Sequence, residues 1–264
     1  MIRVALGELR KLRRPTLSIP TFAIISALST FFTWWVFHSV GNGHNGQRGE
    51  SISSTTLSTP VGFAYGFTIM SFFLGMAAFS IFASQTANEY TLGTLRNLLV
   101  RQPSRVKLLA GKFLAMSTFA LIMNTFAAFT SFITGYLMAG QAKVNTHSWF
   151  TSAGLSHFGK SYLNIFISVI AFGTIGMAVG IILRSPISSL AIGLIWFVIV
   201  ENILGGLITS TVKWLPGQNL MLVGDGGQAG STISYSHALG MSALYLLVLI
   251  ALSGTLFKRR DVAS

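Results

Sequence analysis

The chain has 264 residues, of which 52% are hydrophobic and only 9% are charged, and its formal net charge is +12. Charged residues make up about a quarter of an ordinary soluble domain, so this composition excludes one and indicates a membrane protein. The basic residues lie next to apolar runs instead of forming a separate basic domain, which argues against a nucleic-acid partner. The absence of cysteine excludes disulfides, a thiolate metal site and a thiol nucleophile.

The first apolar stretches predict a surface helix followed by a membrane span. Residues 1–16 combine five basic side chains with leucines and valine at roughly helical spacing, which is typical of an interfacial helix. The uncharged run over residues 17–40 is too long for a signal-peptide core, which usually has about 7 to 15 apolar residues, so we expect it to remain as a span.

Five further apolar runs reach the roughly 20 residues that a helix needs to cross the hydrocarbon core. With the first, the predicted spans are residues 17–40, 61–83, 113–139, 161–183, 187–208 and 236–257. The predicted fold class is therefore an all-α integral membrane protein with six transmembrane helices. A single transmembrane domain is expected over residues 1–264.

The segments between the spans predict the orientation of the chain. Residues 41–60, 140–160 and 209–235 are interpreted as polar loops, and Arg184-Ser185-Pro186 as a tight turn between two spans. Fourteen of the 18 lysines and arginines fall on the side of the membrane that holds both termini and residues 88–112. The positive-inside rule therefore places both termini in the cytoplasm and the three polar loops outside.

Residues 88–112 form a long basic segment between two apolar runs. At about 100° per residue, four leucines of its first part share one arc of a helix: Leu92, Leu95, Leu98 and Leu99. Pro103 is expected to end this amphipathic helix, and Ser104 to cap the next one. Such a helix lies along a membrane surface or in the groove of a partner.

The same segment carries a recognisable pattern, in order Glu89, Gly93-Thr94-Leu95-Arg96, Leu98-Leu99, Pro103-Ser104-Arg105 and Gly111-Lys112. This pattern resembles the signature of ABC-2 type transporter permeases, and with the span pattern the resemblance covers essentially the whole chain. It implies that residues 88–112 form a cytoplasmic coupling element between spans 2 and 3 that contacts an ATP-binding subunit. The residues expected to serve ATPase coupling are Glu89, Gly93, Thr94, Leu95, Arg96, Leu98, Leu99 and Arg101. Alternatively, this segment only holds the spans at the membrane interface.

No nucleotide site is expected on this chain, because Gly111-Lys112 lacks the glycine spacing of a P-loop. The resemblance implies ATP and Mg on a separate ATPase subunit, a second permease copy or paralogue, and export across a bacterial plasma membrane. Hydrophobic drugs, lipids or small peptides would suit the apolar interior. No catalytic residues are expected among only six acids, and the five histidines lack the spacing of a helical metal site.

Two other classes of function stay open. An ion-gradient-driven carrier would transport without ATP, although it would normally need more intramembrane ionisable groups than one glutamate. A membrane assembly or anchoring protein would share the spans and bind no ATPase.

A few polar residues within the apolar runs are candidates for the substrate path. Glu201 is the one acid inside such a run, with Asn202 as a neutral partner, and it either contacts substrate or makes a structural hydrogen bond near the outer surface. Asn124 is expected to bond between helices, and secondarily to line a path. Gly176 and Gly180 match GxxxG, which favours close packing within the chain over a dimer contact.

Overall fold

The computed structural model describes residues 2–40, 53–101, 104–227 and 233–259, and every regular element within these ranges is helical. The N-terminal half contains α1 (Ile2–Leu12), α2 (Pro15–Ser39), α3 (Ser54–Leu57), α4 (Gly62–Ile69), α5 (Ser71–Thr91), α6 (Thr94–Arg101) and α7 (Arg105–Ala139). The C-terminal half contains η1 (Thr146–Phe150), α8 (Ser152–Leu183), α9 (Pro186–Leu194), η2 (Ile195–Val200), α10 (Glu201–Leu207), η3 (Thr209–Trp214), α11 (Pro216–Gly224) and α12 (Tyr235–Arg259).

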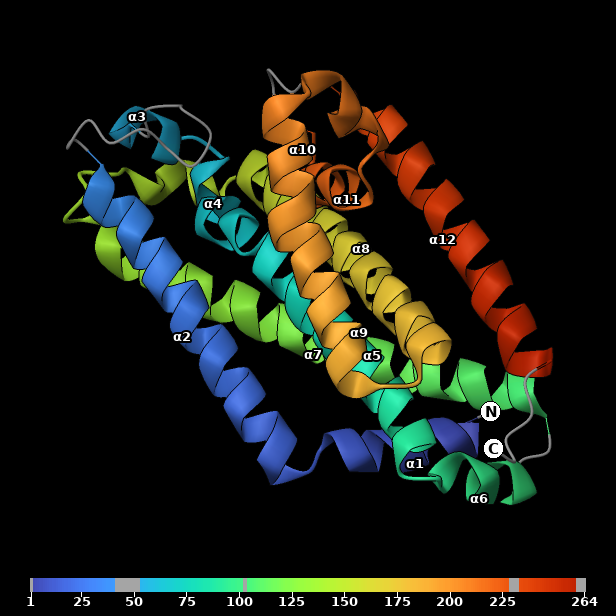
Figure 1. Cartoon of the computed structure of the whole chain (residues 1–264). Coiled ribbons are helices and arrows are strands. Elements are labelled where there is room, and N and C mark those ends of the chain that lie inside the picture. Colours follow the sequence, from blue (N-terminus) through green and yellow to red (C-terminus); the bar gives the residue numbers. More distant parts are fainter. Residues whose placement is uncertain (1, 41–52, 102–103, 228–232, 260–264) are drawn as a thin grey trace.

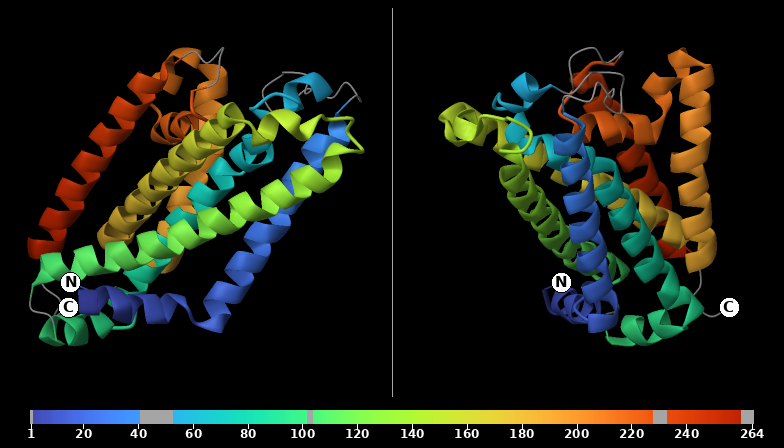
Figure 2. Two further views of the ribbon diagram at one scale, coloured as in Figure 1. Left: turned by 180° about the vertical axis from the view of Figure 1, so that it is seen from behind. Right: turned by 90° about the vertical axis from the view of Figure 1, so that its left-hand side faces the viewer.

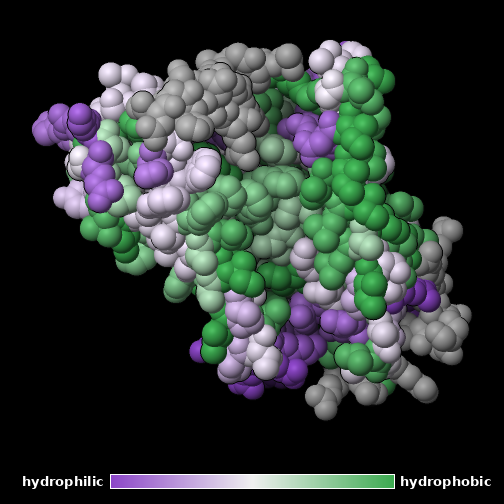
Figure 3. Space-filling model, turned by 60° about the vertical axis from the view of Figure 1, so that its left-hand side comes forward, coloured by the Kyte–Doolittle hydropathy of each residue, from purple (hydrophilic) through white to green (hydrophobic). Residues whose placement is uncertain are grey.

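Within the described ranges, five helices are long and apolar enough to cross a membrane: α2, α7, α8, α12 and the continuous run α9–η2–α10 over Pro186–Leu207. The pair α4 and α5 passes the same test when taken together, although it is bent by 40°, which raises the number to as many as six. Figure 3 shows a broad hydrophobic band between more hydrophilic ends on the face that it presents. The protein is therefore an all-helical, multi-pass membrane protein.

The first, fifth and sixth predicted spans agree with α2, α9–η2–α10 and α12 to within about two residues. The other three predicted spans lie within longer or bent helices, which corrects the helix bounds expected there. The predicted span 61–83 is bent at Met70 and continues to Thr91, while α7 and α8 begin eight and nine residues before the predicted starts of spans 3 and 4. Hydropathy marks the apolar part of a helix, whereas backbone hydrogen bonds carry the helix on through polar residues.

Residues 209–235 are not simply a loop, which corrects a second prediction. They include η3 and α11, and in α11 Leu220 and Val223 are fully buried. Pro216 occupies the first turn of α11, where its missing N–H group costs nothing. This segment therefore adds a packed helix to one end of the bundle.

The core is built around the crossing of α5 and α8. A Cβ atom at Gly176 would lie only 2.3 Å from the carbonyl oxygen of Phe79, so glycine is what lets the two backbones approach so closely. The GxxxG prediction of packing within the chain is thereby confirmed. Nearby, α2 is tied to α7 by Ser29, which donates to the carbonyl of Ala127 at 2.9 Å. Figure 2 shows α7 running obliquely across the back of the bundle.

The two ends of the bundle differ in character. Helices α1 and α6 lie together with the last turn of α12 at one end, while α3, η3 and α11 lie at the other (Figure 1). Helix α1 turns into α2 at Pro15, and the guanidinium of Arg105 on α7 donates to the carbonyl of Phe257 on α12 at 2.6 Å. We call the end with α1 and α6 the charged end, and the other the α11 end.

Candidate functional site: a buried ion cluster beside an amphipathic helix

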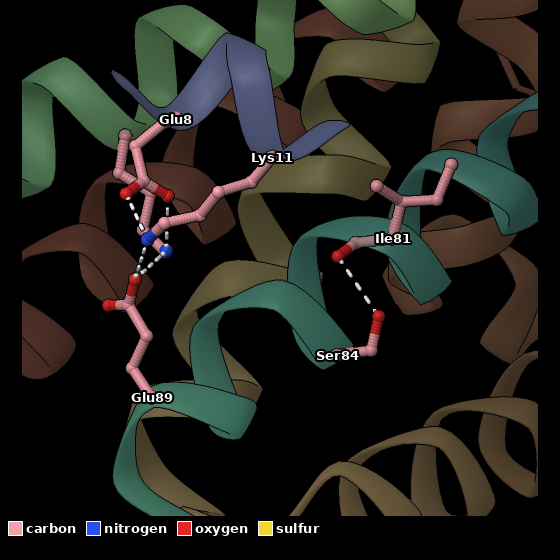
Figure 4. Close-up of polar contacts among 6 residues, drawn as sticks. Glu8, Lys11, Ile81, Ser84 and Glu89 are labelled. Atoms are coloured by element: carbon pink, nitrogen blue, oxygen red, sulfur yellow. Dashed lines mark hydrogen bonds and ion pairs between the residues drawn. The ribbon is translucent and has the colours of Figure 1, made fainter. Parts of the chain in front are cut away.

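Four charged side chains from three helices meet at the charged end, and we call them the ion cluster: Glu8 and Lys11 of α1, Glu89 of α5 and Lys112 of α7. The Nζ of Lys112 lies 2.9 Å from Oε2 of Glu8 and 2.6 Å from Oε1 of Glu89. The Nζ of Lys11 lies 2.5 Å from Oε1 of Glu8 and 3.2 Å from Oε1 of Glu89. Figure 4 shows Glu8 and Lys11 extending from α1 toward Glu89. Each lysine is thus shared by both glutamates.

Burial makes this cluster important for the fold. Lys112 is only 3% exposed, Glu8 6% and Glu89 8%. A buried charge is costly unless it is paired and hydrogen-bonded, and here two cations balance two carboxylates. Glu8 reaches the interior because it shares the inner face of α1 with Ala5 and Leu12 at helical spacing. The cluster therefore fixes α1 against the ends of α5 and α7.

The cluster also shifts the ionisation of its members on α1. Burial by itself raises the pKa of the Glu8 carboxyl, but the charges of Lys112 and Lys11 and their hydrogen bonds outweigh it and hold that pKa below its ordinary value. Burial lowers the pKa of Lys11, but the hydrogen bond and charge of Glu8, aided by Glu89, outweigh burial and raise it above its ordinary value. Both groups are therefore held in their charged forms.

The amphipathic helix predicted from the sequence is α6, and it follows directly after the ion cluster. Gly93 links α5 to α6 with a φ of 65°, in the left-handed region that favours glycine. Leu95 is 3% exposed and Leu98 packs partly against the same core, whereas Val100 is 77% exposed. Leu92 was predicted on the same arc, but it lies before Gly93 and outside α6, and it is 71% exposed. The helix thus holds to its own chain by one face and presents Val100 to the outside.

The remaining coupling residues are placed as far as the described residues allow. Thr94 is exposed in the first turn of α6. The side chains of Arg96, Leu99 and Arg101 lie outside the described part of the structure, as does Pro103. Ser104 caps α7 as predicted, because its hydroxyl accepts from the backbone N–H of Lys107 at 3.4 Å.

Glu201 forms a second buried polar centre, at the α11 end. It is 1% exposed, and its carboxylate accepts from the indole N–H of Trp196 at 2.8 Å and from the backbone N–H groups of Gly217 and Gln218, each at 2.9 Å. A carboxylate at a helix N-terminus also meets the positive end of the helix dipole. A Cβ at Gly217 would lie 2.6 Å from Oε2 of Glu201, so glycine permits this approach. This geometry directly supports the interpretation of Glu201 as a residue that makes structural hydrogen bonds.

The segment around Glu201 departs from regular α-helix. Residues 195–200 form the π-helical segment η2, a geometry that is frequent at functional sites. Asn202 donates to the carbonyls of Phe197 and Val198 at 3.3 and 3.0 Å, so its contacts lie within its own span. At the other end of α11, the hydroxyl of Ser71, at the bend between α4 and α5, donates to Asp225 at 3.1 Å.

Within the described residues, the three predicted substrate-path residues do not form one group. Glu201 bonds to η2 and α11, and Asn202 bonds to backbone carbonyls. Asn124 is fully buried in α7, and neither atom of its side-chain amide bonds to another described residue. The predicted hydrogen bond from Asn124 to another helix is not seen there. Across the same ranges, no group of three or more His, Asp or Glu side chains is arranged to hold a metal ion.

Sequence reasoning identified only part of the ion cluster. It singled out Glu89 as a coupling residue and placed Lys112 in the same pattern, but it counted Lys11 only among the basic residues of the N-terminal segment and passed over Glu8. A usable signal was present, because Glu8 is the one acid among five basic residues of the N-terminal segment and it lies on the apolar face.

Comparison with known families places the chain in one of them. A family described as a protein of unknown function, DUF2705, matches residues 45–263. The chain belongs to this family. It is also similar to the uncharacterized protein YhcI of Bacillus subtilis (strain 168), with 23% identity over 223 residues, which are 75% of this chain and 71% of that protein. The family match includes Glu89, Lys112 and Glu201 but begins after α1, which supplies Glu8 and Lys11.

Proposed function

We propose that this chain is the permease subunit of an ATP-driven ABC exporter that works with a separate ATPase subunit. The observation that carries the proposal is α6, an amphipathic helix that exposes Val100 and is joined to two spans beside the ion cluster. On this account α6 is the coupling helix, and ATP and Mg bind to the partner. This chain supplies the path through the membrane and no catalytic residue.

The geometry supports a mechanical role for the ion cluster. Helix α6 lies between α5 and α7 in the chain. Glu89 is in the last turn of α5, and Lys112 is about two turns into α7. Their contact at 2.6 Å closes the segment that contains α6. A displacement of α6 by the ATPase would therefore move α5 and α7 together, and Glu8 would carry α1 with them.

The charge distribution supports the orientation that this function requires. By the sequence assignment, 14 of the 18 basic residues belong to the side of the termini and α6, and the positive-inside rule supports a cytoplasmic location for that side. In the full proposal the bent pair α4–α5 counts as one of six spans. Helix α1 lies at the inner surface of the plasma membrane. A second copy of the chain, or a paralogue, completes the permease.

Two apolar hollows support a hydrophobic or amphipathic substrate. One of about 510 Å³ lies between α7, α8 and α12, and its lining includes Leu109, Phe113 and Ile250. The other, of about 450 Å³, lies between α5, α8, η2 and α12, and its lining includes Phe79, Phe197 and Leu249. Drugs, lipids and small apolar peptides fit such surroundings better than a charged sugar polymer does.

Affinity purification of the tagged chain from its native membrane in mild detergent, followed by mass spectrometry, tests the proposal. We expect an ATPase with a P-loop to be recovered, and we expect Val100→Asp to lose it because Val100 faces outward on α6. The matched control is Val61→Asp, the same exchange at an exposed position at the α11 end. It should retain the ATPase.

Three results would count against the proposal. Recovery of no ATPase from a monodisperse preparation would favour an assembly or anchoring protein. Transport by the purified chain in vesicles under an ion gradient and without ATP would favour a secondary carrier. Equal recovery of the ATPase with Val100→Asp and with wild type would remove α6 as the coupling helix.

A further inference from the structure

A pocket of about 490 Å³, lined by charged, polar and apolar residues, opens at the charged end, where α1 turns into α2. Its lining comes from α1, the start of α2, the last turns of α5 and the start of α6, and includes Lys11, Arg14, Leu17 and Asn88. We call it the elbow pocket. Because it sits where a surface helix becomes a span, it lies at the level of lipid headgroups.

The charges around the elbow pocket favour an anion. Among the described residues, Glu89 is the one acid in its lining, and that carboxylate is already paired with both lysines of the ion cluster. Lys11 uses two hydrogen bonds in the cluster, although an ammonium group has three donors. Arg14 is exposed and makes no ion pair with any described residue. The lining is therefore one unit positive, and Arg14 supplies the excess.

Neutral hydrogen-bonding groups complete the wall. Thr16, Gln85 and Asn88 contribute one hydroxyl and two amide side chains, and none of the three bonds through its side chain to another described residue. Phosphate oxygens accept several hydrogen bonds at once, and they bind arginine most strongly in the bidentate arrangement. A phosphate group thus matches the free donors of this pocket.

A row of apolar side chains on α2 leads from the pocket into the membrane. It favours phosphate-bearing ligands that also carry an apolar tail. Leu17 lines the pocket, and Ile24 and Phe31 follow on the same face of α2 at intervals of seven residues. Ile24 is 58% exposed and Phe31 49%. Ile24 lies about 10 Å along the helix from Leu17, within the roughly 15 Å depth of one leaflet. A ligand with a phosphate head and an acyl tail would use both features.

We propose that the elbow pocket binds an anionic phospholipid of the adjacent leaflet, with its phosphate on Arg14 and Lys11 and an acyl chain along Ile24. The site requires only that α2 crosses the membrane, so it stands apart from the proposed ATPase partner. A bound lipid would rest against the start of α6 and would hold α1 at the membrane surface.

Native mass spectrometry of the full chain in detergent tests this site, with phosphatidylglycerol and phosphatidylcholine as probes. We expect one phosphatidylglycerol to bind, and Arg14→Gln to weaken it about tenfold, as loss of one charge-assisted contact does. Arg13→Gln is the matched control, because Arg13 is exposed beside Arg14 but does not line the pocket. It should bind as wild type does, and Ile24→Ser should weaken phosphatidylglycerol but not inorganic phosphate.

Other outcomes would overturn the proposal. Equal binding of phosphatidylcholine, or equal effects of Arg14→Gln and Arg13→Gln, would show that the pocket does not select the lipid. Inorganic phosphate binding as tightly as the lipid, and lost in Arg14→Gln, would assign the pocket to a free anion. Unchanged lipid binding by Arg14→Gln, together with loss of a co-purifying protein, would assign it to a protein contact.

Discussion

The buried carboxylates of Glu89 and Glu201, at opposite ends of the bundle, are stabilised by different kinds of partner. Glu89 shares two lysines with Glu8 at the charged end, whereas Glu201 accepts hydrogen bonds from two backbone amides and one indole. Removing a lysine from the first group leaves carboxylates short of a partner, while changing Glu201 mainly costs hydrogen bonds. The charged end should therefore be the more sensitive to single substitutions and to pH.

Lys112→Met should have the largest effect of any substitution in either group. It removes the cation that contacts both glutamates, and loss of one partner from a buried pair costs about 3–5 kcal/mol. Reversible unfolding in mixed detergent micelles would measure it. Lys107→Met, at an exposed position of the same helix, should change the free energy of unfolding by no more than about 0.5 kcal/mol. Equal stability of the two variants would contradict the account of the cluster.

Glu201→Gln should have a smaller effect, confined to the α11 end. Gly217 and Gln218 donate to different oxygens of the carboxylate, and the amide replaces one of these oxygens with a donor, so we expect a loss of about 1–3 kcal/mol. Hydrogen exchange should speed up at those two backbone amides and stay unchanged in α1. Asn202→Ala is the control, because Asn202 bonds only to carbonyls of its own span. Unaltered protection of α11 in Glu201→Gln would refute the structural role.

The substitution Gly93→Ala measures the energetic cost of the left-handed backbone in the link to α6, without a contribution from steric crowding. No atom beyond Gly93 and its two chain neighbours lies within 4 Å of an added Cβ, so the cost of about 1–2 kcal/mol comes from the left-handed φ alone. Gly7→Ala meets equally open space within regular helix α1 and should instead stabilise it by up to about 1 kcal/mol. Thermal unfolding of both variants would show opposite signs. A shared sign would mean that the turn at Gly93 is not held in the native state.

The smallest expected effect is the pH dependence contributed by single groups of α1. The pKa of Glu8 is held below its ordinary 4.5, so its contribution is complete above pH 4.5 and is lost as the pH falls through the lower folded-state value. The pKa of Lys11 is raised above 10.5, so its contribution is complete below pH 10.5 and is lost as the pH rises further. In Glu8→Gln the free energy of unfolding should therefore decrease less steeply as the pH falls below 4.5. The same acid dependence in Glu8→Gln and in wild type would contradict the paired, charged state of Glu8.

The sequence predicted what depends on local pattern. Apolar length gave the spans, Ser104 and Pro186 marked helix starts, and Gly176 indicated close packing, because each acts within its own helix or against a neighbouring surface. Glu89 was singled out as a coupling residue through a short motif.

The remaining features depend on contacts between distant parts of the chain. Glu8 and Lys112 are 104 positions apart, and no local pattern states that they meet. Glu201 was found as an acid in an apolar run, but its donors belong to α11, a helix within a segment interpreted as loop. Helices α7 and α8 also run beyond the apolar stretches that marked the spans, because backbone hydrogen bonds continue a helix through polar residues.

The most direct test of the proposed coupling asks whether ATP hydrolysis changes the conformation of the α11 end by way of the ion cluster. The chain has no cysteine, so Trp214→Cys provides a single label site at a residue that is 57% exposed in η3. In a complex of this chain with the proposed ATPase, we expect ATP to change the rate of maleimide labelling at this site. The same complex carrying Lys112→Met, monodisperse and still bound to the ATPase, should label at a rate that ATP does not change. An undiminished response to ATP in that variant would contradict the proposal that the ion cluster transmits the motion.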